Sequence, residues 1–168
     1  MESTEIEFLD SSLAEEVLHI HYSAVHEGRA PRFYPERILN EWSPPITQKR
    51  IDEFGNKMKG DGAQGVIVTV GGNAVGFGIL VSSESTVGAV YVKAPYTGRG
   101  IGGLILKKIE EMAVSSGCSK LFLDASLNAY EFYKDHGYQT LEKTFHELPS
   151  GVMMKCVKMG KSLGKELS

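Results

Sequence analysis

The stretch Thr97-Gly98-Arg99-Gly100-Ile101-Gly102-Gly103 decides the fold, because it joins a strand-like segment to a helical one. Thr86 to Lys93 before it is rich in valine, and after it apolar residues recur from Ile101 to Ala113 at the spacing of one helical face. A helix that opens from a glycine-rich turn presents unpaired N–H groups and a positive dipole end, which suit a phosphate. We predict that this loop binds a pyrophosphate; the alternative is a tight turn without a ligand.

Two further strands are expected before the loop. The segments from Gln64 to Val70 and from Ala74 to Ser82 are rich in the residues that strands favour. Gly71-Gly72-Asn73 joins them with residues that tolerate positive φ, which predicts a hairpin turn. Together with Thr86 to Lys93, these segments predict an antiparallel meander.

The N-terminal third is less regular. Ile6 to Leu9 alternates like a short strand, and Ser12-Leu13-Ala14-Glu15 has the pattern of a capping box that opens a helix. Residues 27–62 contain four prolines, which interrupt regular structure, and helical turns are expected near 38–42 and 51–58.

The C-terminal third predicts strand, helix, strand, strand. Leu121-Phe122-Leu123 is typical of a strand covered on both faces, and residues 128–136 predict a helix that ends at Gly137. Residues 138–147 and 152–159 predict a closing hairpin. Because a helix joins Thr86–Lys93 to the strand at Leu121, these two strands should be parallel. We expect one α/β domain over residues 1–168, built on a mixed sheet.

Composition excludes several classes of function. A net charge of −3 without a cluster of lysines and arginines gives no footprint for a nucleic acid. Cys118 and Cys156 have no spacing that predicts a disulfide or a zinc site, so no metal is expected. No apolar run approaches membrane-spanning length and the N-terminus has no signal-peptide pattern, so we expect a cytoplasmic protein without a membrane partner.

The glycine run also satisfies the dinucleotide fingerprint GxGxxG, with Asp124 about twenty residues further on. In a dinucleotide-binding fold the strand ends almost at the first glycine, whereas here five residues that include Pro95 intervene. Too few residues follow Gly103 for the remaining strand–helix units of that fold. These features disfavour a nicotinamide-dependent oxidoreductase.

Two motifs resemble the GNAT superfamily of N-acetyltransferases. Residues 90–102, Val-Tyr-Val-Lys-Ala-Pro-Tyr-Thr-Gly-Arg-Gly-Ile-Gly, resemble its cofactor motif, with Gly100 and Gly102 on the two small positions. Thr97 stands where that motif usually has Gln or Arg. Residues 128–138, Asn-Ala-Tyr-Glu-Phe-Tyr-Lys-Asp-His-Gly-Tyr, resemble its second signature. The resemblance covers most of the chain except residues 27–62.

The resemblance implies a GNAT-like fold in which the antiparallel meander is followed by a splayed parallel strand pair, with helices flanking the sheet. It implies acetyl-CoA as co-substrate, with pantetheine between the splayed strands and an amine of a small molecule or a peptide as acceptor. The cofactor-binding residues would be Val90, Val92, Thr97, Gly98, Arg99, Gly100, Ile101, Gly102, Gly103 and Asn128. Val90 and Val92 would act through their backbone, and Arg99 either pairs with a phosphate or points into solvent.

The resemblance also implies direct attack of a neutral amine on the thioester. Tyr133 matches the tyrosine that protonates the departing thiolate, although packing alone is the commoner role of a buried tyrosine. A backbone N–H near Val92 would stabilise the oxyanion. Asn128 caps its helix, contacts the pantetheine arm, or does both.

The general base stays open, because residues 86–92 contain no carboxylate or imidazole. The candidates are a water chain or one of Glu84, Asp124, His21, His26 and Glu27. A non-catalytic CoA-binding regulatory module is the alternative function. A homodimer is an open expectation, since two-fold pairs are the commonest oligomers.

Overall fold

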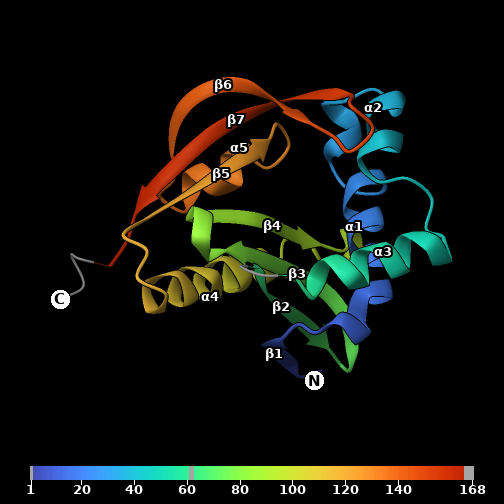
Figure 1. Cartoon of the computed structure of the whole chain (residues 1–168), viewed down its shortest axis with the longest axis horizontal. Helices are drawn as coiled ribbons and strands as arrows, with labels where there is room; N and C mark the ends of the chain where they lie inside the picture. The colour runs from blue at the N-terminus through green and yellow to red at the C-terminus, as the bar shows by residue number, and fades with distance from the viewer. Residues whose placement is uncertain (1, 61–62, 165–168) are drawn as a thin grey trace.

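The computed structural model describes residues 2–60 and 63–164 of the chain. Within them, seven strands form one mixed sheet in the order β1-β2-β3-β4-β5-β7-β6 (Figure 1). The strands are β1 (Thr4–Phe8), β2 (Ala63–Val70), β3 (Asn73–Val81), β4 (Thr86–Val92), β5 (Lys120–Ser126), β6 (Gln139–Glu147) and β7 (Met153–Ser162). The predicted meander is confirmed, because β2, β3 and β4 pair antiparallel in chain order.

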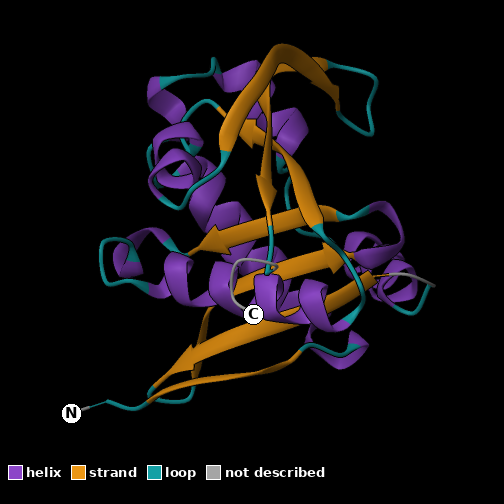
Figure 2. Cartoon of the chain, turned by 90° about the vertical axis from the view of Figure 1, so that its left-hand side faces the viewer, coloured by secondary structure: helices purple, strands orange, loops and turns teal. Residues whose placement is uncertain are grey.

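The sheet opens between β4 and β5, the one parallel pair among the described strands. These strands meet where Thr86 is the partner of Phe122, and the Phe122 N–H donates to the Ser85 carbonyl at 2.9 Å. From there β5 stays paired with β7 as far as Ser126, whereas β4 stays paired with β3. The sheet therefore has two halves that diverge, as Figures 1 and 2 show. The predicted parallel pair and its splay are confirmed.

The helices of the described residues are α1 (Ala14–His26), α2 (Glu36–Trp42), α3 (Gln48–Met58), α4 (Ile101–Ser115) and α5 (Tyr130–Asp135). Helices α4 and α1 cover the two faces of the first half of the sheet. On one face α4 packs into the main core, and on the other α1 packs Val17 and Ile20 against Ile67 and Phe77. Helix α4 can approach β3 closely because Gly78 has no Cβ. A Cβ at this position would collide with Ile105 and Ile109 of α4.

The start of α1 differs from the predicted capping box. Asp10 accepts a hydrogen bond from the Ser12 N–H at 2.8 Å and caps a short 3₁₀ turn, Ser11–Leu13, from which α1 continues at Ala14. The Ser12 hydroxyl also donates to the Asp10 carboxylate, and no side chain caps α1 itself. The predicted capping box is therefore wrong, although the helix is present.

Residues 27–60, which the family resemblance left unplaced, contact both halves: α2 packs with Leu148 and Met154 beside the second half, whereas α3 packs against α1 on the first half. The predicted helical turns are confirmed as α2 and α3. The Tyr34 hydroxyl donates to the Lys155 carbonyl of β7 at 2.5 Å and accepts from the Leu127 N–H at 2.8 Å. Tyr34 thus ties this segment to β7 and to the chain after β5.

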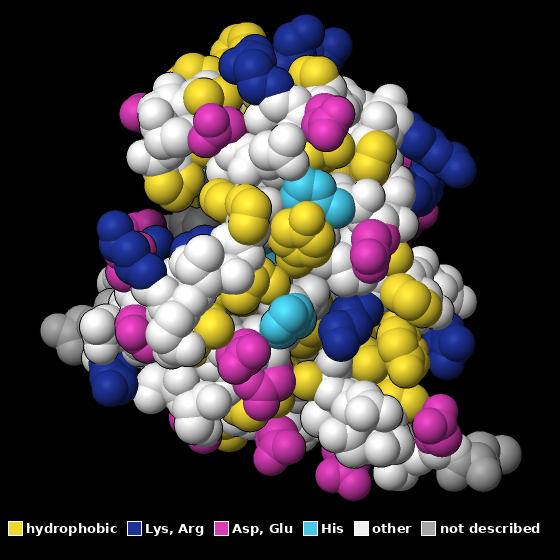
Figure 3. Space-filling model, turned by 90° about the vertical axis from the view of Figure 1, so that its right-hand side faces the viewer, with side chains coloured by type: hydrophobic (Ala, Val, Ile, Leu, Met, Phe, Trp, Pro, Cys, Tyr) yellow, Lys and Arg dark blue, Asp and Glu magenta, His cyan; other side chains and the backbone are white. Residues whose placement is uncertain are grey.

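The distribution of charged side chains on the surface agrees with the near balance of acidic and basic residues in the sequence. On the face in Figure 3, basic side chains are scattered among acidic and apolar ones. None of the helices in residues 2–60 and 63–164 is both long and apolar enough to span a membrane.

Candidate active site

A groove of about 940 Å³ opens where β4 and β5 separate. The two sequence motifs meet in it, although 25 residues, 103–127, separate them in the chain. Of the predicted site residues, all but Arg99 line it: Val90, Val92, Thr97, Gly98, Gly100, Ile101, Gly102, Gly103, Asn128 and Tyr133. The structure therefore places these residues in one cavity, while their individual roles stay predictions.

The N-terminus of α4 forms one end of the groove. Gly100 is the N-cap residue, with φ of 84°, and Gly98 has φ of 78°, so both adopt a left-handed conformation that glycine favours. The first helical hydrogen bond runs from the Leu104 N–H to the Gly100 carbonyl at 3.0 Å. The N–H groups of residues 101–103 therefore precede the helical ladder and are available to an anion.

The two polar side chains of the loop have partners of their own. The Thr97 hydroxyl donates to the Ala94 carbonyl at 2.9 Å. The Arg99 guanidinium lies over the Tyr96 ring, 4.8 Å from its centroid, and Arg99 is exposed. The predicted binding of a phosphate at α4 therefore depends first on the backbone N–H groups of residues 101–103.

The free edge of β4 forms one wall of the groove. Lys93 donates its N–H to the Val75 carbonyl at 2.8 Å, so Lys93 faces β3. Because hydrogen-bonding direction alternates along an antiparallel strand, Tyr91 also faces β3, whereas Val90 and Val92 direct their N–H and C=O groups toward the opening. An extended chain with amide groups could pair with this edge as an added strand would.

The opposite wall presents an unsatisfied polar atom. Asn128 Oδ1 is buried and, among the described residues, has no hydrogen-bond partner. Buried polar atoms without a partner are uncommon and costly, which indicates a ligand that donates a hydrogen bond. The α4 N-terminus, the β4 edge and Asn128 Oδ1 together fit a long ligand with an anionic end and amide groups.

Tyr133 lies on α5 and is 6% exposed. Its ring packs edge-on against Phe132 and Tyr138, with centroids 5.1 and 5.7 Å away. Burial raises the pKa of its hydroxyl, and the charge of ionised Tyr91 would raise it further. Tyr133 therefore remains protonated at neutral pH and can act only as a proton donor in its resting state.

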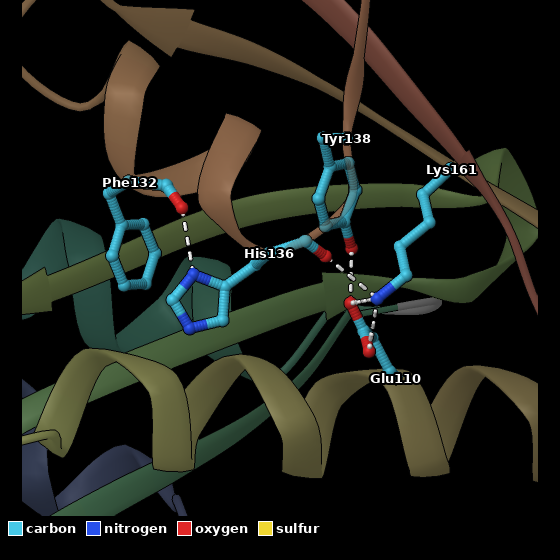
Figure 4. Close-up of polar contacts among 5 residues, drawn as sticks. All are labelled: Glu110, Phe132, His136, Tyr138 and Lys161. Carbon is cyan, nitrogen blue, oxygen red and sulfur yellow. Dashed lines mark hydrogen bonds and ion pairs between the residues drawn. The ribbon is translucent and has the colours of Figure 1, made fainter.

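A partly buried polar network joins the end of α5 to α4 and β7 (Figure 4). Tyr138 donates its hydroxyl to Glu110 Oε2 at 2.9 Å, and Lys161 Nζ donates to both Glu110 oxygens at 3.1 Å. Lys161 Nζ also donates to the His136 carbonyl at 2.9 Å, while His136 Nδ1–H donates to the Phe132 carbonyl at 2.7 Å. These contacts anchor the C-terminal end of the helix that carries Tyr133 to α4 and β7.

The candidates for the general base divide into two groups. His21 Nδ1 shares a hydrogen bond of 3.0 Å with Ser43 Oγ, and His26 Nε2–H donates to the Ser43 carbonyl at 2.8 Å. Neither histidine lines the groove, and Glu27 does not line it either. Burial, with smaller contributions from the charges of Arg50 and His26, lowers the pKa of His21 to about 3, which suits a neutral core histidine.

Glu84 and Asp124 do line the groove. Asp124 lies 3.7 Å from His146, measured from Oδ2 to Nδ1, and His146 also lines the groove. His146 lies in a strand of unremarkable pattern and outside both motifs, so no sequence signal identifies it as a site residue. Only the contact of its side chain with Asp124 in the folded chain does.

Comparison with known proteins agrees with this geometry. The sequence profile of an acetyltransferase (GNAT) domain family matches residues 29–158. An uncharacterised N-acetyltransferase, YjcF of Bacillus subtilis, is 32% identical over 125 residues, which cover 71% of this chain and 85% of that protein.

Solved structures share the fold. A GCN5-related N-acetyltransferase of Rhodopseudomonas palustris superposes with a TM-score of 0.85 at 24% identity, covering 97% of this chain and 98% of that one. The PaiA N-acetyltransferase of Thermoplasma acidophilum, solved in complex with coenzyme A, has a TM-score of 0.72 at 17% identity, covering 96% and 99%. With a profile match over most of its length, the chain belongs to the GNAT family of N-acetyltransferases.

Proposed function

We propose that the groove between β4 and β5 binds acetyl-CoA and an amine side by side and transfers the acetyl group directly between them. The observation that carries this proposal is the convergence of an α4 N-terminus, a free β4 edge and the orphaned Asn128 Oδ1 in one cavity. The pyrophosphate would be held by the N–H groups of residues 101–103. The pantetheine amides would pair with the backbone of Val90 and Val92 and with Asn128.

The thioester supplies an activated acetyl group and a thiolate that can leave. The chain itself supplies position and protons. The Val92 N–H, directed into the groove, would stabilise negative charge on the carbonyl oxygen. Tyr133, which stays protonated because its pKa is raised, would donate its proton to the departing sulfur.

The acceptor would be an amine of a small molecule or a peptide that enters beside α1 and α2, where Ala24, Gly28, Arg29 and Trp42 line the groove. We place the protein in the cytoplasm, in keeping with its two free thiols, Cys118 and Cys156. A homodimer of this chain is part of the same proposal.

Thiol release from acetyl-CoA in the presence of an amine panel tests the proposal, with Tyr133→Phe as the diagnostic variant. Removing only the hydroxyl should lower kcat by about 10²-fold and leave acetyl-CoA affinity nearly unchanged. Tyr130→Phe on the same helix is the matched control, because that hydroxyl bonds Thr140 at 2.7 Å and does not line the groove.

Normal turnover by a well-folded Tyr133→Phe enzyme would remove Tyr133 from the mechanism. Tight acetyl-CoA binding without turnover of any amine would support the regulatory-module alternative.

A further inference from the structure

The pair formed by Asp124 and His146 stands apart from the other ion pairs of the described residues. Two of those pairs join neighbouring turns of one exposed helix, in α1 and in α3, and the pair of Lys161 with Glu110 is the structural contact described above. Asp124 lies on β5 and His146 on β6, with β7 between them. Their side chains span this distance and meet inside the groove, at 3.7 Å.

The nitrogen of His146 that lies nearer to Asp124 is Nδ1, at 3.7 Å from Oδ2, which is ion-pair distance and longer than a direct hydrogen bond. The charge of the carboxylate favours the tautomer that carries the hydrogen on Nδ1. Nε2 is then left with its lone pair. Both side chains are about half exposed, at 52% and 44%, so the ring can be reached by a ligand in the groove and can release a proton to water.

The other histidines of the described chain are placed differently. His21 and His26 are bound to Ser43, and His136 turns its Nδ1 to the Phe132 carbonyl. His19 pairs with Glu15 on an exposed face of α1, outside the groove. His146 alone among them combines a carboxylate partner with a position in the groove.

The charged and titratable surroundings of the pair are mixed. From β7, Cys156 faces Asp124: burial, and then the Asp124 charge, raise the pKa of this thiol to about 11, so the thiol stays neutral. Glu84, Arg29, Lys57, His136 and Tyr133 line other parts of the groove. Cys156 therefore does not compete with His146 for the role of base at neutral pH.

We propose that His146 is the general base that deprotonates the acceptor amine and that Asp124 is its positioning residue. This inference rests on the proposed acetyl transfer. The acceptor ammonium gives one proton to His146 Nε2, and the neutral nitrogen forms its bond to the acetyl carbon. The carbon–sulfur bond breaks, and the sulfur takes a proton from Tyr133. The second nitrogen proton restores Tyr133, and His146 releases its proton to solvent.

A comparison of two amines isolates the base. Ethylamine is protonated at neutral pH and needs a base, whereas 2,2,2-trifluoroethylamine, of similar size, is largely unprotonated and does not. With acetyl-CoA and either amine at pH 7, His146→Gln should lower kcat/KM for ethylamine by about 10²-fold and leave the value for 2,2,2-trifluoroethylamine nearly unchanged. His19→Gln, which removes an imidazole paired with a carboxylate at 3.6 Å outside the groove, is the control and should change neither value.

Equal losses with both amines would show that His146 only shapes the groove, and no loss with either would exclude it as the base; both results overturn the assignment. A wild-type enzyme that binds acetyl-CoA but acetylates neither amine nor any member of the panel would contradict the proposed function itself, and the assignment with it.

The positioning role of Asp124 has its own test. Asp124→Asn should lower kcat for ethylamine by about tenfold without changing KM, because the ring is present but no longer held. Asp124→Glu should restore most of that loss. If Asp124→Asn and Asp124→Glu behave alike, or if KM carries the change, Asp124 does not position the base.

Discussion

Gly100→Ala separates the backbone role of the glycine loop from its role in binding coenzyme A. Gly100 has φ of 84° and an added Cβ would meet no atom within 4 Å, so the substitution strains the backbone without a steric clash. A left-handed conformation costs an L-residue about 1–2 kcal/mol. For a chain of this length, that should lower Tm by about 2–8 °C.

Gly117 provides the matched control. It lies just beyond the C-terminal end of α4, has φ of 89°, and its Cβ would also meet nothing within 4 Å. Gly117→Ala should therefore lower Tm of the free protein by the same amount as Gly100→Ala. Gly117 does not line the groove, whereas Gly100 does.

Coenzyme A distinguishes the two variants in a thermal-denaturation assay. At a concentration of 100 times Kd, the ligand should stabilise the wild type by about 2.7 kcal/mol. The methyl group of Ala at position 100 would push the pyrophosphate away from one N–H group, at a cost of about 1.5 kcal/mol, or roughly tenfold in Kd. Stabilisation by coenzyme A should thus fall in Gly100→Ala and persist in Gly117→Ala. Equal stabilisation of both variants would refute the placement of the pyrophosphate at α4.

Three other predictions concern single side chains. Asn128→Ala should weaken coenzyme A binding five- to tenfold, about 1 kcal/mol, which titration calorimetry measures. It should not destabilise the free protein in urea melts, because Asn128 Oδ1 has no partner among the described residues. His21, whose pKa falls to about 3 on folding from an ordinary 6.5, takes up its proton mainly in the unfolded chain. Its contribution to stability is complete above pH 6.5 and should shrink by about 2 kcal/mol by pH 5, and urea melts of His21→Gln should lack that part of the pH dependence. Tyr138→Phe should lower the free energy of unfolding by about 2 kcal/mol, since Tyr138 is 2% exposed and donates to the Glu110 carboxylate. Tyr130→Phe, which removes an exposed hydroxyl, should lower the free energy of unfolding much less.

The order of strands and helices follows from local patterns in the sequence. The meander, the glycine loop at the start of α4 and the parallel pair across it depend on residue types within each segment and on the order of the segments, and each is confirmed. The capping box failed because the Ser12 hydroxyl donates to Asp10 instead of accepting a hydrogen bond from α1, and sequence pattern alone does not distinguish these two partners.

The position of each side chain was decided by the tertiary structure. His21 and His26 were each candidates for the general base, yet the packing of α1 against the C-terminal end of α2 brings both into hydrogen bonds with Ser43. Arg99 was expected to bind phosphate or to point into solvent; it is exposed and lies over the Tyr96 ring, and its role in binding stays a prediction.

Asp124 and His146 are 22 residues apart and belong to strands that are not neighbours. The sequence by itself determined that this chain builds a phosphate-binding loop between a meander and a helix, because backbone hydrogen bonding and turn chemistry are local. Which carboxylate and which imidazole share the groove depends on the curvature of β6 and β7 and on contacts between distant segments, and only the folded chain fixes these.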